Sequence, residues 1–530
     1  MSALGPEADD PRDASLTRID LTKRRAIVAW RAYPPGMPAQ GGAMKQFVLA
    51  LLASLALASP LHAEGDSEGL ADRGLERRAV EAVIWGMPAV NYDLMRQEML
   101  DTTDAEPNQV LYWGRPLDWM NQTLTPNPDT LYFMVFYDTH GGPVAIEVPA
   151  ANGGSFNGNI VTAWQMPVED LGLLGIDKGA GGKFVLLPPG YAEDIPEGFT
   201  PLRPDTFGGF ALIRANLESH APEHVANSVA YGKQVKVYPL SEAGSPPETV
   251  FVDAQDVLFD STIRYDASFF EHLDRVVQEE PWLDRDRAMI DPLKTLGIEK
   301  RKPFKPDADT RAALDAAAVE GKNFLYDMYD RGWGAFYEGT QWRAAAPPAL
   351  AKAAGDSYTT PDAYPTDLRG MVYTLAFVGI KRLGAGQFYL LTIADKDGAP
   401  LDGAASYRLT VPPDVPVEQY WSATVYDRQS HALVRHMDRA SRSSQLPELA
   451  KNPDGSVDIF FGPEPPQGKE ANWVPTDPRA TSRSCSDFMP PPRRSSTSRG
   501  RWPTSRGLIR PHLREGPLVM RSRRHTDRPL

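Results

Sequence analysis

The stretch Thr125-Pro-Asn-Pro-Asp-Thr-Leu-Tyr-Phe-Met-Val-Phe-Tyr137 contains the clearest structural signal in the chain. Its first half holds two prolines, an asparagine and an aspartate, which are typical of a tight turn. Its second half, from Leu131 onward, is a run of aromatic, β-branched and other apolar residues, which is typical of a β-strand. The stretch therefore predicts a stiff turn that runs directly into a strand.

Other parts of the chain repeat the strand pattern, and helical patterns separate them into two groups. Short apolar runs between Gly, Pro and Asn turns predict strands at 131–137, 144–148, 160–165, 183–187, 210–215, 372–378, 387–393, 406–411, 420–426 and 457–461. Apolar residues at helical spacing predict helices over 70–100, 222–233, 266–277, 282–296 and 307–330. We expect Gly86-Met-Pro88 to break or kink the first helix.

These elements predict an α+β, β-rich fold with two antiparallel β-sandwich-like domains, a helical connector between them and an N-terminal helix. The expected N-terminal β-rich domain covers residues 64–260, the connector 261–348 and the C-terminal β-rich domain 349–478. The segments 1–43, 44–63 and 479–530 do not have the pattern of folded domains.

The composition excludes several classes of protein. The chain has 530 residues, of which 42% are hydrophobic, so the bulk of it is not intrinsically disordered. Its 69 acidic and 56 basic side chains give a net charge of −13, and an acidic body argues against a nucleic-acid partner. A single cysteine excludes an intrachain disulfide and a thiolate metal cluster. No apolar run approaches the roughly 20 residues that span a membrane.

Residues 44–63 have the order of a secretory signal peptide. Met44 and Lys45 precede an apolar stretch from Phe47 to Ala58, and small residues follow up to Ala63. We expect cleavage between Ala63 and Glu64, and hence a periplasmic or secreted protein. Because a signal peptide must begin its chain, we interpret residues 1–43 as a misassigned upstream start.

The C-terminal segment differs from the rest of the chain in composition. From Arg479 to Leu530 it contains 13 Arg, no Lys and three acidic residues, together with the only cysteine, Cys485. A solvated basic tail is one interpretation. However, when 479–506 is back-translated with GC-rich codons, the same bases read two positions on can encode an alternating apolar strand and an amphipathic end. We therefore expect a frameshift near Pro478 and an irregular tail.

Two constellations are candidates for ligand binding. Asn127, Asp129 and Tyr132 place amide, carboxylate and phenol groups on the stiff turn, although an Asx turn that caps the strand would use the same residues. In the predicted strand 420–426, alternation puts Tyr420, Ser422, Thr424 and Tyr426 on one face, and Asp427 follows it. This polar and aromatic face suits a ligand, although a solvated sheet face is the more frequent explanation of such a pattern.

Metal and cofactor signals are weak. His220 and His224 lie four residues apart, but Pro222 stands between them and no carboxylate completes a ligand set. A surface helix start explains them better than a metal site. We expect neither a metal nor a cofactor.

Five stretches resemble a known group of proteins. These are Trp85-Gly-Met-Pro88, Thr125-Pro-Asn-Pro-Asp-Thr-Leu-Tyr132, Lys183-Phe-Val-Leu-Leu-Pro-Pro-Gly-Tyr191, Val415-Pro-Val-Glu-Gln-Tyr-Trp-Ser-Ala-Thr-Val-Tyr-Asp427 and Asn472-Trp-Val-Pro475. They resemble bacterial exported proteins that pair two domains of unknown function, DUF1254 and DUF1214. The resemblance implies a periplasmic or cell-envelope protein with two β-sandwich-like domains and a helical connector. It implies no catalytic residue.

Two hypotheses for the function follow. The first is a binding protein for a small molecule, a glycan or a protein partner, with Asn127, Asp129, Tyr132, Tyr420, Tyr426 and Asp427 as candidate contacts. The second is a hydrolase that uses Asp129 or Asp427 as a general acid or base beside Tyr132. Convergence of two ionisable groups on one cavity would favour the enzyme.

Overall fold

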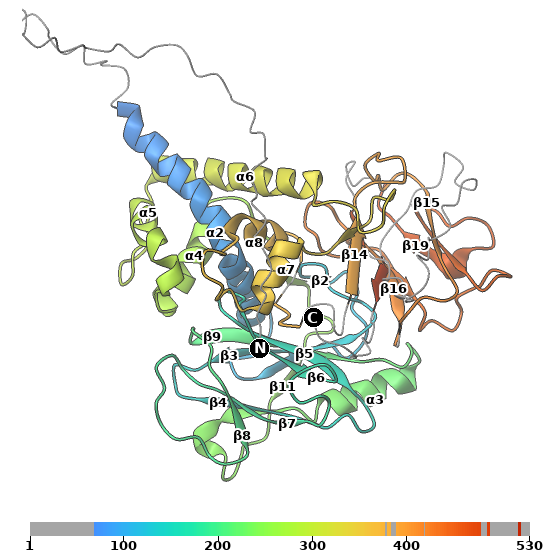
Figure 1. Ribbon diagram of the computed structural model, residues 1–530, viewed down its shortest axis with the longest axis horizontal. Coiled ribbons are helices and arrows are strands. Elements are labelled where there is room, and N and C mark those ends of the chain that lie inside the picture. The colour runs from blue at the N-terminus through green and yellow to red at the C-terminus, as the bar shows by residue number, and fades with distance from the viewer. Residues whose placement is uncertain are drawn as a thin grey trace, which may run out of the picture. The chain divides into compact units, whose positions relative to one another are not determined.

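The computed structural model describes residues 68–376, 379–382, 388–417 and 419–478, together with the strands Cys485–Asp487 and Leu518–Met520. The segments 1–43 and 44–63, and with them the expected cleavage site, lie outside the described residues. The fold class predicted from the sequence is confirmed: helices and largely antiparallel sheets form a β-rich α+β protein (Figure 1). No helix in the described part of the chain combines the length and the apolar character needed to cross a membrane.

The first described helix, α2 (Glu68–Thr102), confirms the helix predicted over 70–100. Pro88 lies inside it, so of the expected break or kink the break is wrong, and the kink stays a prediction. A proline has no N–H to donate to the carbonyl four residues earlier, here that of Ile84. Gly370 of α8 (Thr366–Tyr373) packs against this carbonyl. A Cβ added at Gly370 would lie only 2.6 Å from the Ile84 carbonyl oxygen, so a larger residue would clash there. The glycine thus permits close approach of α8 to α2.

The N-terminal strands form two sheets in the described part of the chain. A six-stranded sheet has the order β11-β1-β3-β9-β5-β6, and a four-stranded sheet has the order β10-β4-β7-β8. The strands of the first are Phe251–Asp253 (β11), Val110–Tyr112 (β1), Leu131–Asp138 (β3), Gly208–Ala215 (β9), Phe156–Thr162 (β5) and Pro167–Gly172 (β6). Those of the second are Lys236–Pro239 (β10), Val144–Val148 (β4), Gly182–Leu186 (β7) and Phe199–Leu202 (β8). A short parallel pair joins Asn121–Gln122 (β2) to Phe259–Asp260 (β12).

Strand β3 has a buried residue at nearly every position because both faces of its sheet are covered. Leu131, Phe133 and Val135 belong to the core between the two N-terminal sheets. Tyr132 and Met134 point the other way and belong to the larger core that contains the helices. The period-2 alternation of a strand therefore sends one set of side chains into each core.

Helices cover the second face of the six-stranded sheet (Figure 1). Helix α2 packs against α4, α5, α6 and α8. The predicted helix over 307–330 is confirmed as α6, and the Asp307 side chain caps it by accepting a hydrogen bond from the Thr310 N–H at 2.8 Å. The helices and 3₁₀ turns after β9 are Pro222–Gly232 (α3), Leu240–Glu242 (η1), Ser268–Glu279 (α4), Asp284–Met289 (η2), Ile290–Thr295 (α5), Ala308–Arg331 (α6), Pro348–Gly355 (α7) and Thr366–Tyr373 (α8).

Among the described residues, the C-terminal strands also form two sheets. One has the order β13-β14-β20-β16-β17, with β21 paired to β14 and β16, and the other has the order β15-β18-β19. Their strands are Arg343–Ala344 (β13), Phe388–Thr392 (β14), Tyr407–Val411 (β15), Trp421–Tyr426 (β16), Ser441–Ser443 (β17), Val457–Gly462 (β18) and Trp473–Pro475 (β19), and a 3₁₀ turn covers Glu470–Asn472 (η3). The predicted strand over 372–378 is wrong for its described part, which begins inside α8. A short apolar run does not distinguish a buried helix from a strand.

Two short strands come from the basic tail. Both β20 (Cys485–Asp487) and β21 (Leu518–Met520) pair antiparallel with β14 and β16. The expectation that the tail is irregular is therefore wrong for these two segments. They lie between β14 and β16 in the sheet and pair with both of them. The rest of the tail lies outside the described residues, and the frameshift stays a prediction.

Candidate functional site

The turn 125–130 is held in place from both sequence halves. Within it, the Asn127 side-chain oxygen accepts a hydrogen bond from the Asp129 N–H at 2.9 Å, as in an Asx turn. The Tyr132 hydroxyl accepts one from the Asn127 N–H at 2.9 Å. From the C-terminal sheet, the Tyr426 hydroxyl donates to the Pro126 carbonyl at 3.0 Å, and Tyr420 accepts from Asn127 Nδ2 at 2.9 Å.

The polar and aromatic face of β16 is therefore neither a solvated surface nor an open binding face. Tyr420, Ser422, Thr424 and Tyr426 are all at most 1% exposed. Three of these side chains contact the turn, while Thr424 lies beside Ser422. The face is buried because it packs against the turn of the N-terminal half.

Asp129 links the N-terminal and C-terminal halves of the chain through buried polar contacts. Its carboxylate accepts a hydrogen bond from the Ser422 hydroxyl of β16, and its Oδ1 lies 3.0 Å from His220 Nε2. The ion pair rests on proximity and charge, because the two atoms are not aligned for a hydrogen bond. Burial alone would raise the pKa of Asp129, but the contacts with His220, Ser422 and Ser441 outweigh it and lower the pKa.

Asp427 has a local structural role. Its carboxylate accepts hydrogen bonds from the backbone N–H groups of Gln429 and Ser430, at 2.9 and 2.8 Å, and from the Ser430 hydroxyl at 3.1 Å. These contacts close the turn that follows β16. Neither Asp129 nor Asp427 lines a described cavity.

A cavity lies behind the turn, between the helix-facing side of the six-stranded sheet and residues of the C-terminal half. Its volume is about 80 Å³, several times the ~10–15 Å³ that one buried water requires, so a small ligand fits. Most of the wall is apolar. Its residues are Asn91, Met95, Trp113, Leu117, Asn121, Thr123, Leu124, Thr125, Pro126, Asn127, Tyr132, Met134, Phe210, Leu212, Arg214, Ala345, Ala376, Ile380, Tyr389 and Tyr426.

Of the six residues predicted to bind a ligand, Asn127, Tyr132 and Tyr426 line this cavity. Tyr420 and Asp129 do not line it but make contacts that hold the turn in place, and Asp427 is also absent from the wall. The two carboxylates thus do not converge on the cavity.

Arg214 and Asn91 are wall residues that the sequence reasoning missed. Arg214 is 5% exposed and lies opposite Tyr132 in the pairing of β3 with β9. A signal was present, because Phe210, Leu212 and Arg214 occupy alternate positions, which puts a cation on an otherwise apolar face of the predicted strand. Asn91 is one polar residue on the long helix α2, and nothing in its surroundings in the sequence distinguishes it.

The two histidines weighed as metal ligands are used otherwise. His220 pairs with Asp129, and its pKa is raised because the contact with that carboxylate outweighs the lowering effect of burial. His224 Nδ1 lies 2.8 Å from the Ser219 hydroxyl. Among the residues that the structure describes, no group of three or more His, Cys, Asp or Glu side chains is arranged to hold a metal ion.

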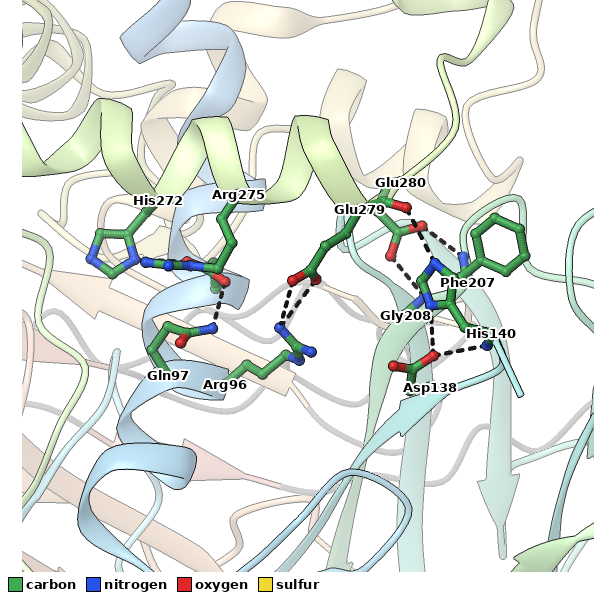
Figure 2. Close-up of polar contacts among 11 residues, drawn as sticks. Arg96, Gln97, Asp138, His140, Phe207, Gly208, His272, Arg275, Glu279 and Glu280 are labelled. Atoms are coloured by element: carbon green, nitrogen blue, oxygen red, sulfur yellow. Dashed lines mark hydrogen bonds and ion pairs between the residues drawn. The ribbon is translucent and has the colours of Figure 1, made fainter. Parts of the chain in front are cut away.

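A second polar cluster lies where the end of α4 meets α2 and the sheet (Figure 2). Arg96 pairs with Glu279 at 3.1 Å, and Asp93 accepts from Arg275 Nε at 2.9 Å. Glu280 accepts hydrogen bonds from the backbone N–H groups of Phe207 and Gly208, both at 2.7 Å. These contacts tie α4 to α2 and to the start of β9. No described cavity adjoins them, so we assign them a structural role.

Glu280 predicts a pH dependence of stability. Burial raises its pKa to about 7, against the opposing effect of the two backbone hydrogen bonds. A raised pKa means that this group stabilises the fold fully below pH 4.5, its ordinary value, and that the contribution is lost as the pH rises through 7. We expect Glu280→Gln to flatten the decline of the free energy of unfolding between these values, as measured by urea titration at each pH. An unchanged slope would contradict the assignment.

Comparison with known proteins places the chain among proteins without an established activity. Two families match it, both described as proteins of unknown function: DUF1254 over residues 107–239 and DUF1214 over residues 386–487. The resemblance seen in the sequence is therefore confirmed, and both domains are present. No curated protein matches the chain.

Two solved structures are similar to this chain. The VPA0106 protein from Vibrio parahaemolyticus is 17% identical with a TM-score of 0.50, and the match covers 78% of this chain and 95% of that one. An uncharacterized protein from Burkholderia cenocepacia is 12% identical with a TM-score of 0.34, covering 80% of this chain and 93% of that one. The first similarity supports a shared fold, and the second supports no argument.

Proposed function

We propose that this chain, which contains a DUF1254 and a DUF1214 domain, is an exported binding protein that holds a small molecule in the cavity behind the turn 125–130. The observation that carries the proposal is the composition of the cavity wall. Apolar residues form most of it, and a few polar groups converge there, which is the usual design of a small-molecule site.

The position of the cavity supports the same conclusion. Its wall combines residues of α2, of the N-terminal sheet and of the C-terminal half, such as Met95, Leu212 and Tyr389. Polar contacts on the turn hold these parts together without filling the cavity. A ligand bound there would contact both halves and would stabilise their packing by mass action.

The hydrolase hypothesis lacks support from the geometry. General acid or base catalysis needs a titratable group within hydrogen-bond reach of the substrate. Asp129 is engaged by Ser422 and His220, and Asp427 closes its own turn. The Ser422 hydroxyl donates to a carboxylate and not to a histidine base, so it is not arranged as an activated nucleophile.

A cavity-filling substitution tests the binding proposal. Ala345 is a half-buried wall residue, and Ala345→Trp would place an indole in or across the cavity. We expect the wild type to bind 1-octanol or octanoate at one site in calorimetric titration, and Ala345→Trp to bind neither. Ala316→Trp on the exposed side of α6 is the matched control and should bind as the wild type does. Absence of binding by the wild type, or equal binding by both variants, would contradict the proposal.

Export supplies a separate prediction. Signal peptidase requires a small residue before the bond that it cleaves, and Ala63 provides one after the apolar stretch. We therefore expect the mature protein to begin at Glu64. Intact-mass measurement of the protein from a periplasmic fraction checks this, and a mature chain that retains residues 1–43 would show that export by this segment is wrong.

A further inference from the structure

The two short strands of the basic tail together fill one strand position in the C-terminal sheet. Consecutive residues of β14, Leu390 and Leu391, pair with Leu518 of β21 and with Asp487 of β20. Strand β16 pairs with the same two segments in the same order, with β21 beside its first residues and β20 beside its last. Because each segment has three residues, the position between β14 and β16 holds an antiparallel strand of six residues made from two pieces.

The break between the two pieces has an entropic cost. The pieces are connected through residues 488–517, so pairing both of them in one strand position closes a long loop. One continuous strand would make the same backbone hydrogen bonds to β14 and β16 without closing that loop. The position is therefore suited to a single unbroken strand.

The neighbouring strands determine which side chains this position accepts. In an antiparallel pair, residues that lie opposite each other have their side chains on the same face of the sheet. One face of β16 carries Trp421, Ala423 and Val425, which are at most 7% exposed and belong to the large hydrophobic core. A strand paired with β16 should therefore have apolar residues at every second position.

The alternative reading frame of the tail encodes such a strand. Near its start, the sequence obtained by reading the back-translated bases of 479–506 two positions on contains D-F-E-V-L-F-R-L. Every second residue of this segment is apolar, in the order phenylalanine, valine, phenylalanine and leucine. The segment would follow β19 in the chain, as β20 does.

We propose that the position between β14 and β16 is a strand-binding site, and that its occupant is the segment D-F-E-V-L-F-R-L in place of β20 and β21. The frameshift prediction serves here only to name the occupant, and the inference is independent of the cavity and its ligand. Binding would be a β-augmentation. Backbone hydrogen bonds to β14 and β16 would provide the affinity, and the alternating apolar side chains would fix the register.

A synthetic peptide tests this inference on the full chain. The peptide D-F-E-V-L-F-R-L, labelled with fluorescein, is titrated with the protein, and its fluorescence anisotropy is measured. We expect saturable binding at one site. A peptide with proline in place of the valine should bind about tenfold more weakly or worse, because proline cannot donate a hydrogen bond within a central strand. The same eight residues in the order F-F-V-L-L-D-E-R lose the alternation and should also bind more weakly.

Hydrogen exchange locates the bound peptide. Binding should slow the exchange of backbone amides in β14 and β16, because an unbroken strand then lies between them. Strands β15 and β18 pair with each other in the other C-terminal sheet, so they are the matched controls and should not change.

A chain in which the alternative-frame sequence replaces residues 479–506 provides a second test. It should not bind the added peptide, because its own strand fills the site. The inference would be overturned if the original chain did not bind the peptide, if the proline peptide bound equally well, if the protected amides lay outside β14 and β16, or if the replaced chain still bound.

Discussion

Replacing Asp129 with alanine should lower the free energy of unfolding by about 3–5 kcal/mol, the usual effect of removing one partner from a buried ion pair. Asp129 is fully buried and joins His220 of the N-terminal half to Ser422 of the C-terminal half. The alanine would leave the largely buried His220 without its carboxylate and the Ser422 hydroxyl without its acceptor. Urea unfolding followed by fluorescence measures the loss.

The effect should depend on pH in a defined way. The pKa of Asp129 is lowered, so its contribution is present above 3.8 and is lost as the pH falls through the folded-state value. The pKa of His220 is raised, so its contribution is present below 6.5 and is lost as the pH rises through its folded-state value. The difference between wild type and Asp129→Ala should therefore be largest between pH 3.8 and 6.5.

A surface carboxylate provides the control. The Asp256 side chain is 85% exposed and lies 3.0 Å from Arg115. Exposed ion pairs contribute ~0–1 kcal/mol, so Asp256→Ala should change stability by no more than that. Equal losses of unfolding free energy in the two variants would show that Asp129 does not link the two halves of the chain.

Arg369→Met should destabilise the protein by about 3 kcal/mol, since each hydrogen bond from a charged group contributes roughly 1.5–3 kcal/mol. Arg369 lies on α8, is 1% exposed, and donates to the Trp164 carbonyl at 2.7 Å and to the Tyr364 hydroxyl at 2.6 Å. Its guanidinium also lies 4.7 Å from the centre of the Tyr358 ring, which adds a cation–π contact.

Thermal and urea unfolding of Arg369→Met measure this loss. Arg331→Met is the matched control, because Arg331 is 67% exposed and pairs with Asp327 four residues earlier on α6. The control should lose about 0.5 kcal/mol or less. If Arg369→Met were as stable as the control, the contacts of Arg369 would not be what holds α8 against the N-terminal half.

The sequence patterns predicted most elements because strands and helices each have a distinct spacing of apolar residues. Strands β3, β4 and β9 and helices α2 and α6 lie where alternation, β-branching and capping residues indicate them. The run 372–378 was assigned to the wrong class, because Tyr373 and its apolar neighbours are buried by α2 and not by a sheet. A contact with a helix almost 300 residues earlier leaves no trace in the local sequence.

The turn 125–130 was singled out from its residue types alone, but its partners were not predictable. Asx-turn chemistry explains Asn127, whereas the contacts of Asp129 with Ser422 and His220 join residues that are 293 and 91 positions away. Only the packing of the two halves brings these side chains together. For the same reason, alternation placed Tyr420 and Tyr426 on one face but did not show that another part of the chain covers it.

A crystal structure of the mature protein with octanoate tests the central claim most directly. We expect density for the ligand in the cavity behind the turn 125–130, with its chain against Met134 and Leu212. A cavity that stays empty at saturating octanoate, or that is closed by its own side chains while the ligand binds elsewhere, would contradict it.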